Sequence, residues 1–175
     1  MTFKSKFCLK SKRTLELTKK NIIDVCTLKK THWKFGLKKQ LNWFKENITK
    51  EDIHNFLLFN KKIVGYTCLR KRSFILNNIN TKTFLYFDTL IIDTKYRKLN
   101  LSPILMRFNS KIIKLNKAPS FLVCKKNLYR FYKKFNWKFA EKKNFKIMDH
   151  QTQKKIMYFN LRKNQNYKIK IFIYK

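Results

Sequence analysis

The stretch from residue 83 to residue 124 constrains the fold more than any other part of the sequence. It contains an apolar strand-like run over residues 83–92, an amphipathic helical pattern over residues 103–116 and a short buried strand over residues 119–124. Two strands that are joined through a helix need a crossover connection and usually pair in parallel. The sequence therefore predicts a parallel β–α–β unit.

The preceding segments predict two helices and a hairpin. Residues 13–17 alternate enough for a short strand, and apolar residues at helical spacing predict helices over residues 18–30 and 37–47. Over residues 52–74 the apolar residues recur at every second position instead, which predicts a hairpin of two strands. These elements would extend the sheet with antiparallel strands.

The later segments predict one helix, over residues 127–135, and further strands. The strand-like runs lie in residues 137–148, 154–162 and 167–174. The expected fold class is α/β (α+β) with a mixed sheet that is mostly antiparallel, has one parallel pair and is flanked by about four helices. With only two glycines and two prolines and no linker-like stretch, residues 1–175 are expected to form one domain with its core over about residues 13–162.

The charge of the chain is extreme and leaves two explanations open. There are 43 Lys and Arg residues against 9 Asp and Glu residues, a formal net charge of +34. Lysine, asparagine, isoleucine, phenylalanine and tyrosine share A- and T-rich codons, so a biased genome could produce such a composition. Selection for an anionic partner would also produce it, although such selection usually gathers the charge on one face or in a tail. Here the lysines are spread along the whole chain.

The four cysteines indicate free thiols in a reducing compartment. They form no pair with metal-ligand spacing, so no metal site is expected, and Cys68 and Cys124 lie in apolar strand-like runs where a buried thiol is usual. The N-terminus lacks the apolar region of a signal peptide, and no apolar run reaches the length of a membrane span. These features predict a cytoplasmic protein.

The junction between the long strand and the following helix, YRKLNLSPILMRF, has the position of an anion-binding turn. Ser102 is expected to cap the helix, with Pro103 in its first position. The N–H groups of Lys98 to Ser102 could converge on a phosphate, helped by Arg97 and the helix dipole. Asn100 stands where a left-handed residue would be needed. The alternative is an ordinary strand–helix corner with solvated lysines.

This junction resembles the acyl-CoA-binding segment of the GNAT acyltransferase superfamily. In TLIIDTKYRKLNLSPILM, Arg97 matches the first residue of the family pattern Arg/Gln-x-x-Gly-x-Gly/Ala, while Asn100 and Ser102 occupy its two glycine positions.

A second segment, LYRFYKKFNWKF, resembles the family pattern Phe-Tyr-x-x-x-Gly-Phe. Phe131 and Tyr132 match, and Asn136 and Trp137 replace the glycine and the last phenylalanine. One helix and one strand separate the two segments, as the family requires, and the resemblance covers about residues 13–162.

The resemblance implies an N-acetyltransferase that uses acetyl-CoA, or another acyl-CoA, as co-substrate. The backbone at the end of the strand would contact the pantetheine arm, and the turn would hold the pyrophosphate. The residues implied in coenzyme binding are Leu90, Ile91, Ile92, Arg97, Lys98, Leu99, Asn100, Leu101, Ser102 and Asn127.

Two residues are candidates for catalysis. By the resemblance, Tyr132 would protonate the leaving thiolate of coenzyme A, whereas the alternative is an aromatic stripe of a helix. Asp88 lies in the middle of an apolar strand, where a carboxylate needs either a partner or a role such as that of general base. His32 and His54 are weaker candidates for the base.

The acceptor stays open. Parts of the first half, such as THWKF and QLNWFKENI, resemble GNAT enzymes that acylate amino groups of nucleotide-linked sugars in polysaccharide biosynthesis. An amine on a protein is the second acceptor class. The rival from another class is a basic nucleic-acid-binding protein without catalysis, which the charge and the interleaved aromatics of residues 127–139 would suit.

Overall fold

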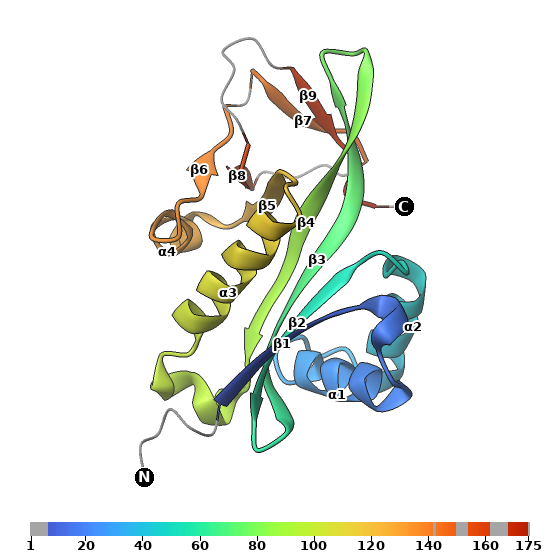
Figure 1. Ribbon diagram of the computed structural model, residues 1–175, viewed down its shortest axis with the longest axis vertical. Coiled ribbons are helices and arrows are strands. Elements are labelled where there is room, and N and C mark those ends of the chain that lie inside the picture. The colour runs from blue at the N-terminus through green and yellow to red at the C-terminus, as the bar shows by residue number, and fades with distance from the viewer. Residues whose placement is uncertain (1–6, 142, 150–153, 162–167, 175) are drawn as a thin grey trace. The chain divides into compact units, whose positions relative to one another are not determined.

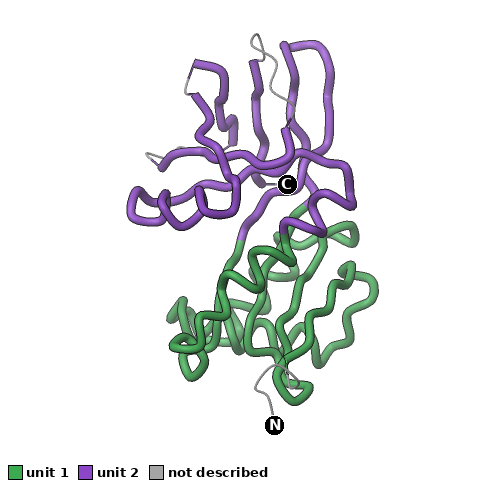
Figure 2. The backbone as a smooth tube through the Cα atoms, turned by 60° about the vertical axis from the view of Figure 1, so that its left-hand side comes forward, with its two compact units in different colours: residues 1–70, 89–109 green, residues 71–88, 110–175 purple. Residues whose placement is uncertain are grey.

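The fold was analysed in a computed structural model, which describes residues 7–141, 143–149, 154–161 and 168–174 (Figure 1). The chain divides into two compact units (Figure 2): unit 1 comprises residues 1–70 and 89–109, and unit 2 comprises residues 71–88 and 110–175. Strands β3 (Lys62–Leu76) and β4 (Asn80–Ile92) and helix α3 (Ser102–Leu115) contribute to both units. That the whole chain is one domain stays a prediction.

The described residues form a mixed sheet with helices, which confirms the expected fold class. The other elements are β1 (Phe7–Arg13), η2 (Thr14–Glu16), α1 (Lys19–Lys30), α2 (Leu37–Asn47), β2 (Ile53–Phe59), η3 (Thr94–Leu99), β5 (Ser120–Cys124), η4 (Lys126–Leu128), α4 (Tyr129–Lys133), β6 (Lys138–Phe139), β7 (Phe145–Ile147), β8 (Lys155–Phe159) and β9 (Ile169–Ile171). The strands are hydrogen-bonded in the order β1-β2-β3-β4-β5-β8-β6, and β9 pairs with β3 and β7. Strands β4 and β5 pair in parallel, as the β–α–β pattern predicts, and β7 and β9 form a second parallel pair that was not expected.

The predicted helices α1 and α2 and the β2–β3 hairpin are confirmed. The Thr18 hydroxyl caps α1 by accepting from the Asn21 N–H at 3.2 Å. The hairpin turns at Asn60 and Lys61, which have φ angles of 48° and 64°. Positive φ at both central residues is what a type I′ two-residue hairpin turn requires.

The strand expected over residues 13–17 is wrong, because β1 ends at Arg13 and a 3₁₀ turn follows. Within this turn the Arg13 N–H donates to Glu16 Oε2 at 2.6 Å, and the Leu17 N–H donates to the Thr14 carbonyl at 3.1 Å. These local hydrogen bonds compete with the hydrogen bonds of a sheet.

The helix expected over residues 127–135 is shorter than expected, since it is split into η4 and α4. The late strands fall within their predicted runs, of which residues 142, 162 and 167 lie outside the described residues.

Unit 1 has helices on both faces of its strands. On one face, α1 and α2 pack against Phe56, Tyr66 and Cys68. On the other face, the first turns of α3 pack through Leu101 and Leu105 against Leu57 and its neighbours. This alternation along β2 is what a strand buried on both faces requires.

Gly65 of β3 lets α3 approach closely in unit 1. A Cβ atom at this position would lie 2.8 Å from Ile92 Cδ1 and 3.1 Å from Leu57 Cβ. Both distances are shorter than ordinary contacts, so any side chain here would displace the layer on which the β4–α3 junction sits.

Unit 2 has a separate core that is rich in aromatic rings. Phe74, Phe84 and Phe121 pack edge to face, with ring centroids 5.0–6.2 Å apart. Ile169, Ile171 and Ile173 complete this core. The buried cysteines Cys26, Cys68 and Cys124 form no disulfide bond among the described residues, as expected, and no described helix is long and apolar enough to cross a membrane.

His54 is a buried core residue of unit 1. Its Nε2 atom lies 2.9 Å from Thr14 Oγ1 and its Nδ1 atom lies 2.7 Å from the Tyr66 hydroxyl, and its ring stacks on Phe44. Burial lowers the pKa of His54 to about 4, against a smaller opposing effect of Asp52. The ring is therefore neutral at pH 7 and has a packing role.

We expect this neutral histidine to make stability depend on pH. The unfolded chain binds a proton near pH 6.5, whereas the folded protein resists it until about pH 4. The contribution of His54 to stability should therefore be constant above pH 6.5 and should fall by roughly 3 kcal/mol as the pH drops to 4. Urea unfolding at a series of pH values measures this. His54→Gln should lose this dependence and His32→Gln should keep it; equal profiles for the two variants would contradict the assignment.

Candidate functional site

The end of β4 and the turn after it are fixed to the core of unit 1. The Asp93 N–H donates to the Val64 carbonyl at 2.8 Å, and the Tyr96 ring packs on Phe59 with ring centroids 5.5 Å apart. Ile92 and Leu101, the residues on either side of the turn, are both buried. Each buried aliphatic side chain contributes roughly 1.5–3 kcal/mol, so the turn is anchored at both ends.

The turn has the left-handed residue that the sequence predicts. It begins at Asp93, whose Oδ1 accepts from the Lys95 N–H at 3.0 Å, and continues as η3 to Leu99. Asn100 then has φ 52° and ψ 42°, in the left-handed region. Asparagine is among the non-glycine residues that adopt this region most readily, so it replaces glycine with little strain.

Helix α3 begins one residue earlier than expected. The Leu101 carbonyl accepts from the N–H groups of Ile104 and Leu105 at 3.1 and 3.2 Å, so Leu101 is the N-cap. Ser102 is then the first helical residue rather than the cap, and Pro103 is the second. The N–H groups of Leu101 and Ser102 follow the left-handed residue Asn100 and lie at the positive end of the helix dipole.

The cationic residues of the turn face solvent. Arg97, Lys98, Leu99 and Asn100 are exposed, and Arg97 Nε donates to the Ile92 carbonyl at 3.4 Å. The guanidinium is thereby held over the end of β4, where Leu90 is half-buried and Ile91 is buried. Exposed cations beside a helix N-terminus and a left-handed turn fit the phosphates of a coenzyme.

In unit 2, Tyr132 is positioned by the end of helix α4. The Trp137 N–H donates to the Tyr132 carbonyl at 3.3 Å, and the Asn136 N–H donates to the Lys133 carbonyl at 3.0 Å. Asn136 has φ 63°. This is a Schellman motif with asparagine in the position that usually holds glycine.

The Schellman motif brings Trp137 onto Tyr132. Their ring centroids are 6.3 Å apart, and both contact Phe87. Tyr132 is 8% exposed, and burial raises its pKa above the ordinary value, with a smaller contribution from Cys124. The phenol therefore keeps its proton at neutral pH, as a proton donor must.

Cys124 and Trp137 are neighbours of Tyr132 that the sequence did not identify. Burial raises the pKa of Cys124 to about 11, and its Sγ lies 3.8 Å from Met157 Sδ. Cys124 lies at the end of β5, which pairs in parallel with β4, and this position could have identified it as a candidate neighbour of the site.

The remaining candidates are placed as follows. Asp88 is half-buried in β4, with its Oδ2 atom buried, and Asn127 is exposed in η4. Both belong to unit 2 with Tyr132, whereas Leu90 to Ser102 belong to unit 1. His32 is exposed after α1, and the described residues contain no group of three or more His, Cys, Asp and Glu side chains placed to hold a metal ion.

Comparison with known proteins identifies the fold. No family model and no curated protein matches this sequence. Among solved structures, an acyl-CoA N-acyltransferase from Pseudomonas aeruginosa has a TM-score of 0.63 at 11% identity, covering 87% of this chain and 97% of its own. A GNAT family N-acetyltransferase from Escherichia coli in complex with CoA also has a TM-score of 0.63 at 11% identity, covering 87% and 80%.

An aminoglycoside 6′-N-acetyltransferase complexed with coenzyme A is similar as well, with a TM-score of 0.59 at 12% identity, covering 85% of this chain and 94% of its own. Likeness at such identities shows the fold alone. The chain therefore has the fold of GNAT acetyltransferases, in agreement with the two sequence segments.

The left-handed turn at residue 100 generates a prediction about stability. Asn100→Gly should leave the free energy of unfolding almost unchanged, because glycine adopts this conformation freely. Asn100→Val should lower it by about 1–2 kcal/mol, because a β-branched residue is strained there. Denaturant unfolding of each variant measures the difference.

Asn80→Val is the matched control, since Asn80 is exposed at the start of β4, where valine is favoured. If the two valine variants have equal stability, the conformation assigned to Asn100 is wrong.

Proposed function

We propose that this protein is an acyl-CoA-dependent N-acyltransferase that transfers an acetyl or related acyl group to an amine. The observation that carries the proposal is the left-handed turn at Asn100, which joins a strand paired in parallel with β5 to the N-terminus of α3. The similar solved structures that contain coenzyme A support this assignment.

The turn would bind the pyrophosphate of the coenzyme. Arg97 and Lys98 would supply charge, and the N–H groups of Leu101 and Ser102 would donate hydrogen bonds with the dipole of α3 behind them. Pro103 has no N–H to add, so the Ser102 hydroxyl and the cations carry more of the binding. Leu90 to Ile92 would offer backbone groups to the pantetheine arm, and Leu99, Asn100 and Asn127 complete the proposed set of coenzyme-binding residues.

The transfer itself forms a C–N bond and breaks the C–S bond of the thioester. The amine attacks the carbonyl carbon, and the sulfur leaves as a thiolate that must gain a proton. Tyr132 would donate that proton from its hydroxyl group. The amine must also lose a proton, and Asp88 is the candidate acceptor, directly or through water.

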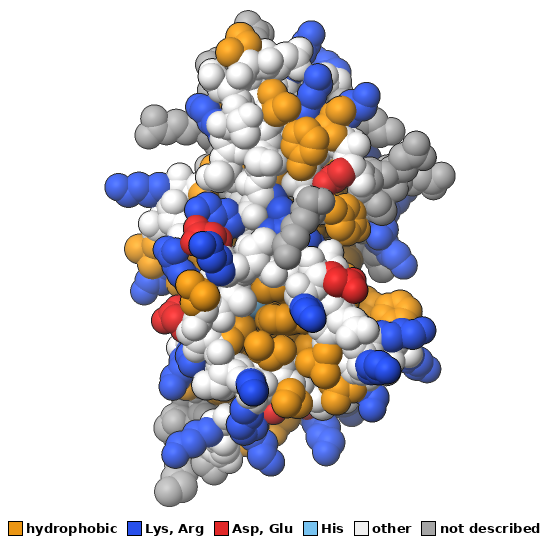
Figure 3. Space-filling view, turned by 90° about the vertical axis from the view of Figure 1, so that its right-hand side faces the viewer, with side chains coloured by type: hydrophobic (Ala, Val, Ile, Leu, Met, Phe, Trp, Pro, Cys, Tyr) orange, Lys and Arg blue, Asp and Glu red, His pale blue; other side chains and the backbone are white. Residues whose placement is uncertain are grey.

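The acceptor would be an amino group on a nucleotide-linked sugar, because a cation-rich protein suits its diphosphate, and a protein amine is the second class. The nucleic-acid-binding alternative expects cations gathered on one surface. On the face in Figure 3, Lys and Arg side chains are spread among hydrophobic and polar ones. Steady-state assays with a panel of amine acceptors test the choice of acceptor.

Tyr132→Phe tests the proposed mechanism. It removes only the hydroxyl and keeps the ring that contacts Phe87 and Trp137. Acyl transfer should fall by roughly 10²–10⁴-fold, mainly in kcat, because the proton is needed only as the thiolate leaves. Thermal stability should change little.

Tyr129→Phe is the matched control, since Tyr129 lies one turn away in α4 and packs on Phe139. It should transfer at the wild-type rate. A fully active Tyr132→Phe enzyme would remove Tyr132 from the mechanism.

A further inference from the structure

Unit 2 contains a pocket that none of the coenzyme or catalytic candidates lines. Its volume is about 500 Å³, and its walls come from β3, β4, the C-terminal end of α3 and the segments before β5 and after β8. The pyrophosphate turn, in contrast, lies at the N-terminal end of α3. We call this cavity the Pro119 pocket.

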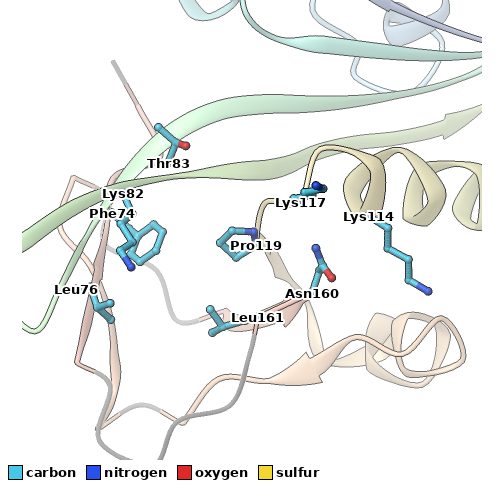
Figure 4. Close-up of a pocket in the computed structure, with 9 residues that line it drawn as sticks. All are labelled: Phe74, Leu76, Lys82, Thr83, Lys114, Lys117, Pro119, Asn160 and Leu161. Carbon is cyan, nitrogen blue, oxygen red and sulfur yellow. The ribbon is translucent and has the colours of Figure 1, made fainter.

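The floor of the Pro119 pocket is apolar. Phe74, Pro119 and Leu161 surround the hollow in Figure 4, and Leu76 extends the apolar wall. Phe74 is itself buried in the core of unit 2, so it presents part of a fixed ring. Such a surface favours a ligand with an apolar body.

The rim of the same pocket is cationic. Lys82, Lys114 and Lys117 are exposed at its edge, and none of the described residues that line it is acidic. In Figure 4, Lys82 lies beside Phe74 and Lys117 lies near Pro119, while the end of Lys114 points away from Pro119. The charge complements an anionic group.

The backbone of the rim is held in place. Lys117 has φ 51° and its N–H donates to the Lys114 carbonyl at 3.0 Å, which closes the end of α3. Asn160 Nδ2 donates to the Ala118 carbonyl at 2.9 Å. The rim therefore does not have to be ordered when a ligand binds.

From this combination we propose that the Pro119 pocket binds a small amphiphilic carboxylate, with a short aliphatic body on Phe74, Pro119 and Leu161 and its carboxylate at the cationic rim. The proposal is independent of acyl transfer, because no residue of the proposed reaction takes part in it.

Titration with butanoate, hexanoate and octanoate tests the proposal, with the backbone amides of Leu76 and Asn160 followed by NMR in about 0.15 M salt. Affinity should rise by roughly three- to fourfold for each added methylene, because each one is buried on the apolar floor. An unspecific attraction of anions to a chain of charge +34 would show no such dependence and would overturn the proposal.

Two matched double variants test the role of the rim. Lys82→Gln with Lys117→Asn should weaken octanoate binding by about tenfold, because two of the three cationic side chains of the rim lose their charge. Lys111→Gln with Lys138→Gln removes the same charge from exposed positions outside the pocket and should leave the affinity within about twofold. Equal losses in the two would contradict the site.

A variant that fills the pocket tests its location. Leu161 is half-buried and faces the hollow in Figure 4, so Leu161→Trp should fold and occupy it. Saturable octanoate shifts at Leu76 and Asn160 should disappear while the rest of the spectrum is unchanged. Retained binding in this folded variant would show that octanoate lies elsewhere.

Discussion

The left-handed backbone conformation, adopted without glycine, is the constraint on which both candidate segments depend. The residues with positive φ in the described part of the chain are six asparagines and two lysines, and none is glycine. Asparagine tolerates this region at a smaller cost than other side chains because its short amide can bond locally. Asn100 lets the β4–α3 turn close, and Asn136 forms the Schellman motif that sets Trp137 against Tyr132.

Each of these turns is held in place by the unit to which it belongs. In unit 1, the β4–α3 turn is anchored by Asp93, Tyr96 and Leu101, and Gly65 permits α3 to approach the strands. In unit 2, Tyr132 lies among Phe87, Trp137 and Phe131 with its proton retained by burial. Rigid elements of this kind are what a transfer reaction requires of its binding turn and its acid.

Much of the fold could be predicted from sequence because its signals are local. The spacing of apolar residues predicted the positions of α1, α2, β2 and β4. The strand–helix–strand pattern predicted the parallel pairing of β4 and β5. The failures were at element ends. Residues 14–16 form a 3₁₀ turn instead of the expected strand, and Leu101 rather than Ser102 is the N-cap of α3. Local hydrogen bonds decide the conformation at both positions.

Those features of the candidate site that depend on local backbone conformation could be predicted from the sequence. Those that depend on packing between side chains could not. Asn100 has the left-handed φ expected for it, and Asn136, which stands at the glycine position of the second family pattern, has a left-handed φ as well. The contribution of Cys124 to the environment of Tyr132 depends on a contact between distant segments, which one sequence does not encode locally. The burial of His54 between Thr14 and Tyr66 is of the same kind.

Amide hydrogen exchange at Leu101 and Ser102 with and without acetyl-CoA tests the central claim most directly. If the turn binds the pyrophosphate through these N–H groups, saturating acetyl-CoA should slow exchange at both residues. A short acetyl thioester that lacks the pyrophosphate should not. Saturable binding of acetyl-CoA that leaves exchange at Leu101 and Ser102 unchanged would contradict the proposed role of the glycine-free turn.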